Sequence, residues 1–215
     1  MESPYIVQTL GASWRIPSEL QMVLEWMDRG DLKNVLDSTT LESYPWVEKT
    51  HTMISVIEGL VFLHSLNVIH RDLKSRNILV DSVKGAKLTD FGVSREVTAE
   101  TMTIGVGTYR WMAPEILLHN HYSVAADIYS FGVVLAELST HKIPFSDVLN
   151  DNGSSLVDTA IMTQVANGTI KPTLGSTCPG WVRKLAESCL AWSADDRPTT
   201  YEIAHIIYQH IEESL

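Results

Sequence analysis

The sequence predicts an α+β fold in which a small strand-rich segment precedes a larger, mainly helical body. Three observations lead to this prediction. Residues 6–10 and 21–25 are short β-type runs on either side of a turn that contains Pro17. From Val47 onward, apolar side chains recur at helical spacing. Residues 124–138 are apolar almost all round, which is typical of a helix buried on every side.

The elements between these landmarks follow from local signals. Asp31 comes directly after Gly30 and is expected to cap a short helix over residues 32–36. The long helix that begins at Val47 leads into short β-type pieces at residues 68–69, 78–80 and 86–88. Residues 93–108 are rich in Thr and Gly and hold few large apolar anchors, so we expect that segment to be mobile.

Beyond Pro114 the pattern is helical almost to the end of the chain. Apolar stripes at helical spacing over residues 182–190 and 203–211 predict two further helices. Thr199, with a glutamate three residues later, predicts a capping box at the start of the second of these. Residues 152–155 predict a surface loop between helices.

The composition disfavours several classes of protein. The 215 residues include 16 basic and 26 acidic side chains, and the net charge of −10 disfavours bulk binding to nucleic acid. No apolar run reaches the roughly 18–20 residues that a membrane helix needs, and the amino terminus lacks a secretory pattern, so we expect no membrane insertion. Cys178 and Cys189 are the only cysteines and are interpreted as buried thiols, which favours a cytoplasmic protein.

The strongest functional signal is the segment 68–80, which reads VIHRDLKSRNILV. Within its polar loop, Asp72, Lys74 and Asn77 bring together a carboxylate, an ammonium and a carboxamide. Phosphoryl transfer needs such a set: an acceptor that orients the attacking hydroxyl, a cation for developing charge, and an oxygen ligand for magnesium. Taken alone, the same loop could also be a solvated polar turn.

A second carboxylate, Asp90, follows 13 residues after Asn77 and opens the tripeptide Asp-Phe-Gly. Residues 84–88 predict a tight hairpin that returns the chain beside the first loop. We therefore expect the Asp90 carboxylate to lie opposite Asn77. Mg²⁺ takes oxygen ligands, typically one or two carboxylates together with phosphate oxygens, so this pair is a candidate magnesium site.

Three further motifs follow in order: GTYRWMAPE at residues 107–115, DIYSFG at 127–132 and DDRPT at 195–199. Together the five motifs resemble the catalytic domain of eukaryotic protein kinases, over about residues 4–211. Trp111 makes the third motif similar to the tyrosine-kinase-like branch, whose members mostly phosphorylate serine and threonine. The resemblance implies a protein-kinase-like, two-lobed α+β fold with a partial β-rich amino-terminal lobe and a complete helical carboxy-terminal lobe.

The resemblance also implies roles for the residues that could carry the reaction. Asp72 would be the catalytic base and Lys74 would steady the transferred phosphoryl group, while Asn77 and Asp90 would hold Mg²⁺. The residues that match the hinge and the nucleotide site are Leu24 as gatekeeper, Glu25 and Met27 beside adenine, Asp31 near the ribose, and Leu79 under the adenine ring.

A second set of matching residues would organise the activation segment. Glu115 and Arg197 resemble a buried ion pair, and Asp127 resembles an acid that bonds back to the catalytic loop. The others are Arg71, which would pair with a phosphorylated or acidic activation segment; His70 and Phe91 in an apolar spine; Gly92; and Thr108 beside Lys74. Thr98, Thr101 and Thr103 are either regulatory phosphosites or solvated turn residues.

The implied activity is transfer of the ATP γ-phosphoryl group to a serine or threonine of a protein substrate in signal transduction, with ATP and Mg²⁺ as cofactors. Lys74 favours this acceptor class, because in the serine/threonine pattern this lysine can bond both the phosphate and a threonine such as Thr108. One alternative is a catalytically incompetent kinase-like fragment, or pseudokinase, that acts as an interaction module. Another is a small-molecule phosphotransferase, which residues 107–115 disfavour because they resemble a segment that receives an extended peptide.

The chain departs from the family pattern on its amino-terminal side. Gly11-Ala12-Ser13 is not a Gly-x-Gly-x-x-Gly loop, and no Val-Ala-Ile-Lys-like strand precedes Pro4. We therefore expect residues 1–29 to be the remnant of the amino-terminal lobe and hinge, and residues 30–215 to be the carboxy-terminal lobe. We expect the chain alone to be a poor kinase, a longer polypeptide with these parts restored to phosphorylate, and other domains to be present on the full-length chain.

Overall fold

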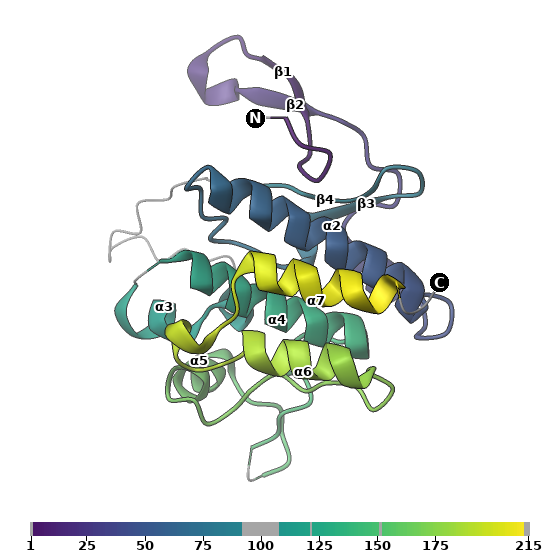
Figure 1. Cartoon of the computed structure of the whole chain (residues 1–215). Coiled ribbons are helices and arrows are strands. Elements are labelled where there is room, and N and C mark those ends of the chain that lie inside the picture. The colour runs from purple at the N-terminus through teal and green to yellow at the C-terminus, as the bar shows by residue number, and fades with distance from the viewer. Residues whose placement is uncertain (1, 92–107, 121, 151, 213–215) are drawn as a thin grey trace.

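The computed structural model describes residues 2–91, 108–120, 122–150 and 152–212. Within these ranges, the structure holds two small antiparallel sheets and a larger body of helices, and two α-helices come between the sheets in the chain, so the predicted α+β class is confirmed (Figure 1). No helix in these ranges is both long and apolar enough to cross a bilayer. The elements in chain order are β1 (Thr9–Ser13), β2 (Gln21–Leu24), α1 (Leu32–Ser38), α2 (Trp46–Ser65), β3 (Ile78–Asp81), β4 (Gly85–Leu88), α3 (Pro114–His119), α4 (Val124–Thr140), α5 (Asp158–Ala166), α6 (Gly180–Cys189) and α7 (Thr200–Glu212).

The β1–β2 hairpin projects from one end of the molecule, beyond β3, β4 and α2 (Figure 1). All five residues of β1 are exposed. The predicted first strand over residues 6–10 is wrong in its placement, because the hairpin pairs Thr9 with Leu24 and Ser13 with Gln21. Ile6 instead forms an isolated parallel bridge to Leu88, and it is buried there. The apolar run that predicted a strand is therefore used to attach the chain to β4.

The β3–β4 hairpin lies as predicted, with Ile78 opposite Leu88 and Leu79 opposite Lys87. The predicted cap of the short helix is also confirmed, since the Asp31 side chain accepts a hydrogen bond of 2.9 Å from the Asn34 amide at the start of α1. An aspartate at this position satisfies one of the free amide groups of the first helical turn.

Helix α2 ends in a turn that the β-type reading of residues 68–69 did not anticipate. Asn67 adopts a left-handed conformation with φ of 57°. The amide of Asn67 donates to the His64 carbonyl and the amide of Val68 to the Leu63 carbonyl, at 3.0 and 2.9 Å. This is the bonding pattern of a Schellman motif, which asparagine tolerates at the left-handed position. The Val68 amide therefore closes the helix and does not join a sheet.

Helix α4 runs through the middle of the helical body, and 13 of its 17 residues are buried, as its apolar composition predicted. It packs on α6, and α2 packs on α7 and on β4 (Figure 1). The capping box before α7 is confirmed: the Thr199 amide donates to the Glu202 carboxylate at 2.8 Å.

Two expectations for the second half of the chain need comment. The prediction of near-continuous helix after Pro114 is wrong for the described stretches between α4 and α5 and between α5 and α6, which are mainly irregular. The segment predicted to be mobile lies outside the described residues, apart from Thr108, and so do Thr98, Thr101 and Thr103.

Candidate active site

The loop after α2 brings the three predicted polar side chains together. Lys74 Nζ lies 2.9 and 2.8 Å from the two carboxylate oxygens of Asp72. The Asn77 side-chain amide donates to the Asp72 carbonyl at 2.7 Å and to its carboxylate at 2.9 Å. Lys74 also reaches Thr108 Oγ1, at 3.2 Å, across 34 residues of sequence. One carboxylate is thus held by a cation and an amide, with a hydroxyl from a distant segment at the same lysine.

Asp127 accepts hydrogen bonds from the backbone of this loop. The carboxylate lies at the start of α4, is 1% exposed, and accepts hydrogen bonds from the amides of His70 and Arg71 at 2.8 and 2.9 Å. His64 donates to it from α2, with Nε2 2.8 Å away. Arg71 has a φ of 69°, a backbone conformation that is costly for a residue with a side chain. The buried carboxylate therefore stabilises a strained turn immediately before Asp72.

His70 is buried beneath the loop. Its Nδ1 accepts from the Asp72 amide at 3.4 Å, and burial lowers the pKa of the ring, which favours the neutral imidazole. Its Nε2 has no partner among the described residues. The neighbouring Arg71 guanidinium is exposed and lies 5.7 Å from the centre of the Tyr122 ring.

The β3–β4 hairpin returns the chain to the loop, as predicted. The Thr89 amide donates to the Asn77 carbonyl at 3.0 Å. This bond holds Asp90, the next residue, near Asn77, its predicted partner in binding magnesium. Asp90 is exposed, with a φ of 57°. Phe91 is partly buried against the core, whereas Gly92 lies outside the described residues.

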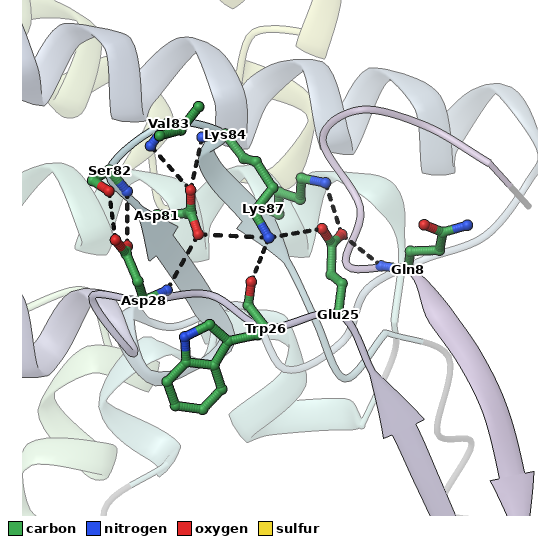
Figure 2. A network of polar contacts seen from close by, with 9 residues as sticks. All are labelled: Gln8, Glu25, Trp26, Asp28, Asp81, Ser82, Val83, Lys84 and Lys87. Atoms are coloured by element: carbon green, nitrogen blue, oxygen red, sulfur yellow. Dashed lines mark hydrogen bonds and ion pairs between the residues drawn. The ribbon is translucent and has the colours of Figure 1, made fainter.

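The hinge region is tied to the β3–β4 hairpin by a polar network (Figure 2). The Glu25 carboxylate accepts from the Gln8 amide at 2.8 Å, and it pairs with Lys87 at 2.7 Å and Lys84 at 3.2 Å. Burial acts to raise the pKa of Glu25, but bonds from these three donors outweigh it and hold the pKa below its usual value. Asp81 also belongs to the network, because its carboxylate pairs with Lys84 Nζ at 3.5 Å. Hydrogen bonds from the backbone amides of Lys84 and Val83 lower the pKa of Asp81 to about 2.

The other residues predicted for the nucleotide site lie around this hinge. Leu24 ends β2, and Met27 is buried. Leu79 forms an isolated bridge with Asp31, which brings β3 beside the start of α1. Both Asp31 carboxylate oxygens bond Asn34, one to its amide and one to its side chain, at 2.9 Å each. Asp31 therefore has a capping role that the sequence had also indicated.

The predicted ion pair between Glu115 and Arg197 is present. Two guanidinium nitrogens each lie 2.7 Å from a Glu115 carboxylate oxygen, and the Arg197 side chain is fully buried. The arginine also donates to the carbonyls of Ala191, Ala125 and Trp192. This pair attaches the segment around α3 to the loop before α7.

Comparison with known proteins identifies the arrangement. The protein kinase domain family matches residues 1–209. This chain belongs to the protein kinase family. The chain resembles a probable serine/threonine-protein kinase of Dictyostelium discoideum, at 36% identity over 90% of this chain and 11% of that protein. The serine/threonine-protein kinase STY17 of Arabidopsis thaliana is 34% identical over 97% of this chain and 35% of its own length. The tyrosine-protein kinase Abl of Drosophila melanogaster is 32% identical over 100% of this chain and 13% of its own length.

The kinase chain thus spans about a third or less of each of these relatives. These relatives include serine/threonine-protein kinases and a tyrosine-protein kinase, which agrees with the resemblance to the tyrosine-kinase-like branch. Membership of the protein kinase family also accounts for the strand-rich segment ahead of a helical lobe.

Sequence reasoning missed two residues of this kinase that support the loop. No role was predicted for His64 from the sequence, yet its Nε2 donates to Asp127. Glu137 was not singled out, although it is 1% exposed and bonds both Ser75 and Trp111. A usable signal was present for Glu137, since a carboxylate inside an otherwise apolar helix needs hydrogen-bond partners.

Proposed function

We propose that this chain is the catalytic part of a protein serine/threonine kinase, which transfers the γ-phosphoryl group of ATP to a hydroxyl of a protein substrate. The observation that carries the proposal is the contact of Lys74 with both Asp72, at 2.8 Å, and Thr108, at 3.2 Å. A base, a cation and the segment proposed to receive the peptide then meet at one point, which is what positioning for phosphoryl transfer requires.

Asp72 is the proposed base. Its carboxylate orients the acceptor hydroxyl and takes its proton as the hydroxyl oxygen bonds to the γ-phosphorus and the bond to the ADP oxygen breaks. Lys74 steadies the charge on the transferred group, because its ammonium is held at the reacting carboxylate. Arg71, Asp127, Glu115 and Arg197 act at a distance, by holding the loop and the segment after it.

Asn77 and Asp90 are the proposed magnesium ligands. The Asn77 amide nitrogen is used in two bonds to Asp72, which turns its Oδ1 into the atom that can ligate. Asp90 supplies an exposed carboxylate at the end of the hairpin beside it. Two hard oxygen donors suit Mg²⁺, which neutralises phosphate charge when bound.

For the nucleotide, the hinge backbone at Glu25 and Met27 is proposed to bond adenine, with Leu24 and Leu79 as apolar contacts. The ion pairs of Glu25 support this, since they fix the hinge. The Glu25 amide donates to the Gln8 carbonyl and the Met27 carbonyl accepts from the Gly30 amide, so the Glu25 carbonyl and the Met27 amide are the backbone groups proposed to bond adenine. Asp31 is proposed to contact the ribose while it caps α1, since each of its carboxylate oxygens can accept a second hydrogen bond. Residues 1–29 are proposed as amino-terminal lobe and hinge, and residues 30–215 as carboxy-terminal lobe.

The test is phosphoryl transfer by the natural full-length polypeptide, since this chain spans only part of the length of its relatives. With Mg²⁺ and γ-labelled ATP, we expect label on serine or threonine of a mixed peptide library. We expect Asp72→Asn to lose at least about a thousandfold in kcat while still binding ATP. Asp37→Asn, at an exposed ion pair of α1, is the matched control and keeps full activity. Binding of Mg²⁺-ATP without any transfer would overturn the proposal, and label on tyrosine alone would overturn the acceptor assignment.

A further inference from the structure

Glu137 is a carboxylate in the last turn of α4, a mainly apolar helix. It is 1% exposed on α4, where its neighbours in sequence are buried apolar residues. Its Oε1 accepts from Ser75 Oγ at 2.7 Å, and its Oε2 accepts from Trp111 Nε1 at 2.7 Å. Burying a carboxylate is costly unless it is fully bonded, so a specific pairing with these two donors is what the position provides.

The two partners belong to the two segments that meet at the proposed reaction centre. Ser75 opens the short helical turn Ser75–Asn77 and follows Lys74 directly. Trp111 ends the turn Thr108–Trp111, which begins with the threonine that Lys74 contacts. A second bond from α4 holds the same tryptophan, since Ser130 Oγ donates to the Trp111 carbonyl at 2.8 Å.

These contacts form a closed ring. Lys74 bonds Thr108 at 3.2 Å, and Glu137 bonds both Ser75, the residue after Lys74, and Trp111, at the end of the turn that begins with Thr108. Only one residue separates Ser75 from Asn77, and two residues separate Thr108 from Trp111. A shift of Glu137 would therefore move the Lys74 and Thr108 side chains relative to one another.

We propose that Glu137 is a positioning residue that holds the segment proposed to receive the acceptor peptide, residues 108–111, against the catalytic loop. This inference rests on the proposed function and specifies how the peptide side of that site is kept in place. The larger effect is expected on the acceptor, because Trp111 belongs to the segment proposed to receive the peptide and neither partner belongs to the hinge proposed to bond adenine.

The hydrogen bonds of Glu137 with Ser75 and Trp111 determine which variants test the proposal. Burial raises the pKa of Glu137 to about 7, while Ser75, Trp111 and the Lys33 ammonium of α1 act to lower it. The neutral acid is thus accessible, and a glutamine can reproduce its bonds: the amide oxygen accepts from Trp111, and the amide nitrogen donates to Ser75 Oγ. Leucine fills a similar volume and accepts neither bond.

The experiment compares Glu137→Gln, Glu137→Leu and Trp111→Phe in the full-length kinase. We expect Glu137→Leu and Trp111→Phe to raise the KM for a peptide substrate on the order of tenfold, while the KM for ATP stays within about twofold. Glu137→Gln is expected to restore most of the peptide KM. Ser139→Ala is the matched control, because Ser139 is buried two residues further along α4 and bonds Gly175, away from the loop.

A second readout does not depend on activity. The indole N–H resonance of Trp111, assigned by its loss in Trp111→Phe, should move strongly in Glu137→Leu, move little in Glu137→Gln and stay in place in Ser139→Ala. Amide exchange over residues 108–111 should accelerate in Glu137→Leu. If Glu137→Leu is unstable, Trp111→Phe removes the same bond from the other end, and the peptide KM and the amide exchange over residues 108–111 can be measured in that variant.

The possible outcomes separate the two proposals. Peptide and ATP KM values that rise together, or a Glu137→Leu protein with unchanged peptide KM, would overturn the positioning role. If the wild type transfers no phosphate at all, the proposed function fails. In that case, an unshifted indole and unchanged exchange would also overturn the inference, whereas the expected shifts would support Glu137 as the link between the two segments.

Discussion

Arg197 and Glu115 lie 82 residues apart in the sequence and form a two-pronged ion pair with both N–O distances at 2.7 Å. Because the guanidinium is fully buried and also donates to three backbone carbonyls, it joins three separate stretches of the helical lobe. The planar guanidinium allows these bonds at once, which a lysine ammonium does not.

The first prediction follows from this geometry. Arg197→Lys should lower the free energy of unfolding by about 2–4 kcal/mol, because it leaves buried acceptors and one carboxylate oxygen without donors. Chemical denaturation at pH 7 measures the change. Arg183→Lys, at a residue whose guanidinium donates to the Gly175 carbonyl at 2.8 Å, is the control with a smaller expected effect. An Arg197→Lys protein as stable as the wild type would contradict the role of the pair.

The second prediction concerns Asp127. Asp127→Asn replaces one acceptor oxygen by an amide nitrogen, so one of the three donors (the His70 amide, the Arg71 amide or His64) faces another donor. We expect a loss of about 2–4 kcal/mol in stability, and a fall in kcat larger than the change in either KM. His64→Gln keeps one donor toward Asp127 and should cost less in both measurements. Equal losses in the two variants would contradict the assignment of the backbone amides as the important partners.

The third prediction concerns the hinge network of Figure 2. Glu25 and Lys87 are each 12% exposed at the side chain, and a double-mutant cycle with Glu25→Gln and Lys87→Met should give a coupling on the order of 1 kcal/mol. Lys87→Met should raise the KM for ATP about threefold and leave the peptide KM unchanged. A second cycle, with Asp37→Asn and Lys33→Met, is the control; Asp37 is 55% exposed at the side chain, so a smaller coupling is expected there.

The sign of the pH effect at this network is also defined. The pKa of Glu25 is lower in the folded chain than its ordinary value of 4.5, so its contribution to stability is fully present above about pH 4.5. It is lost as the pH falls below that value. Coupling that persists unchanged at a pH below the folded-state pKa of Glu25, where the carboxyl group is protonated, would show that the pair is held by packing and not by charge.

The fourth prediction concerns Lys49, whose side chain is buried with no hydrogen-bond partner among the described residues for its Nζ. Burial lowers its pKa from 10.5 to about 8, and the rings of Trp46 and Tyr44 lie 5.0 and 5.8 Å from the ammonium. Since the folded state binds the proton more weakly than the unfolded chain, stability should rise as the pH increases from about 8 to 10.5.

Lys49→Met should therefore stabilise the protein by about 1–2 kcal/mol at pH 7, the gain being reduced by the lost contacts with the two rings. The difference from the wild type should shrink as the pH approaches 10.5. Denaturant unfolding at several pH values measures it, with the exposed Lys142→Met as control. A destabilised Lys49→Met protein at pH 7 would mean that the ring contacts outweigh the cost of burying the charge.

Much of the fold was predictable because it depends on local patterns. The apolar composition of residues 124–138 indicated a buried helix, and Asp31 and Thr199 indicated helix starts, since both signals lie within a few residues of the element they define. The candidate site was predictable in its membership for a different reason. Asp72, Lys74 and Asn77 are close in sequence, so a single loop brings them together whatever surrounds it.

The amino-acid sequence by itself determined where most helices start and which polar residues cluster in one loop. Tertiary structure decided how the first apolar run is used: Ile6 pairs with Leu88 of β4, and the hairpin strand begins only at Thr9. Ile6 is buried on β4, whereas it would be exposed if it extended the hairpin. It also decided that Glu137 lies between Ser75 and Trp111 and that Lys74 reaches Thr108. Such contacts join segments 26 to 62 residues apart, and they form only where the packing of α4 offsets the entropy of closing those loops.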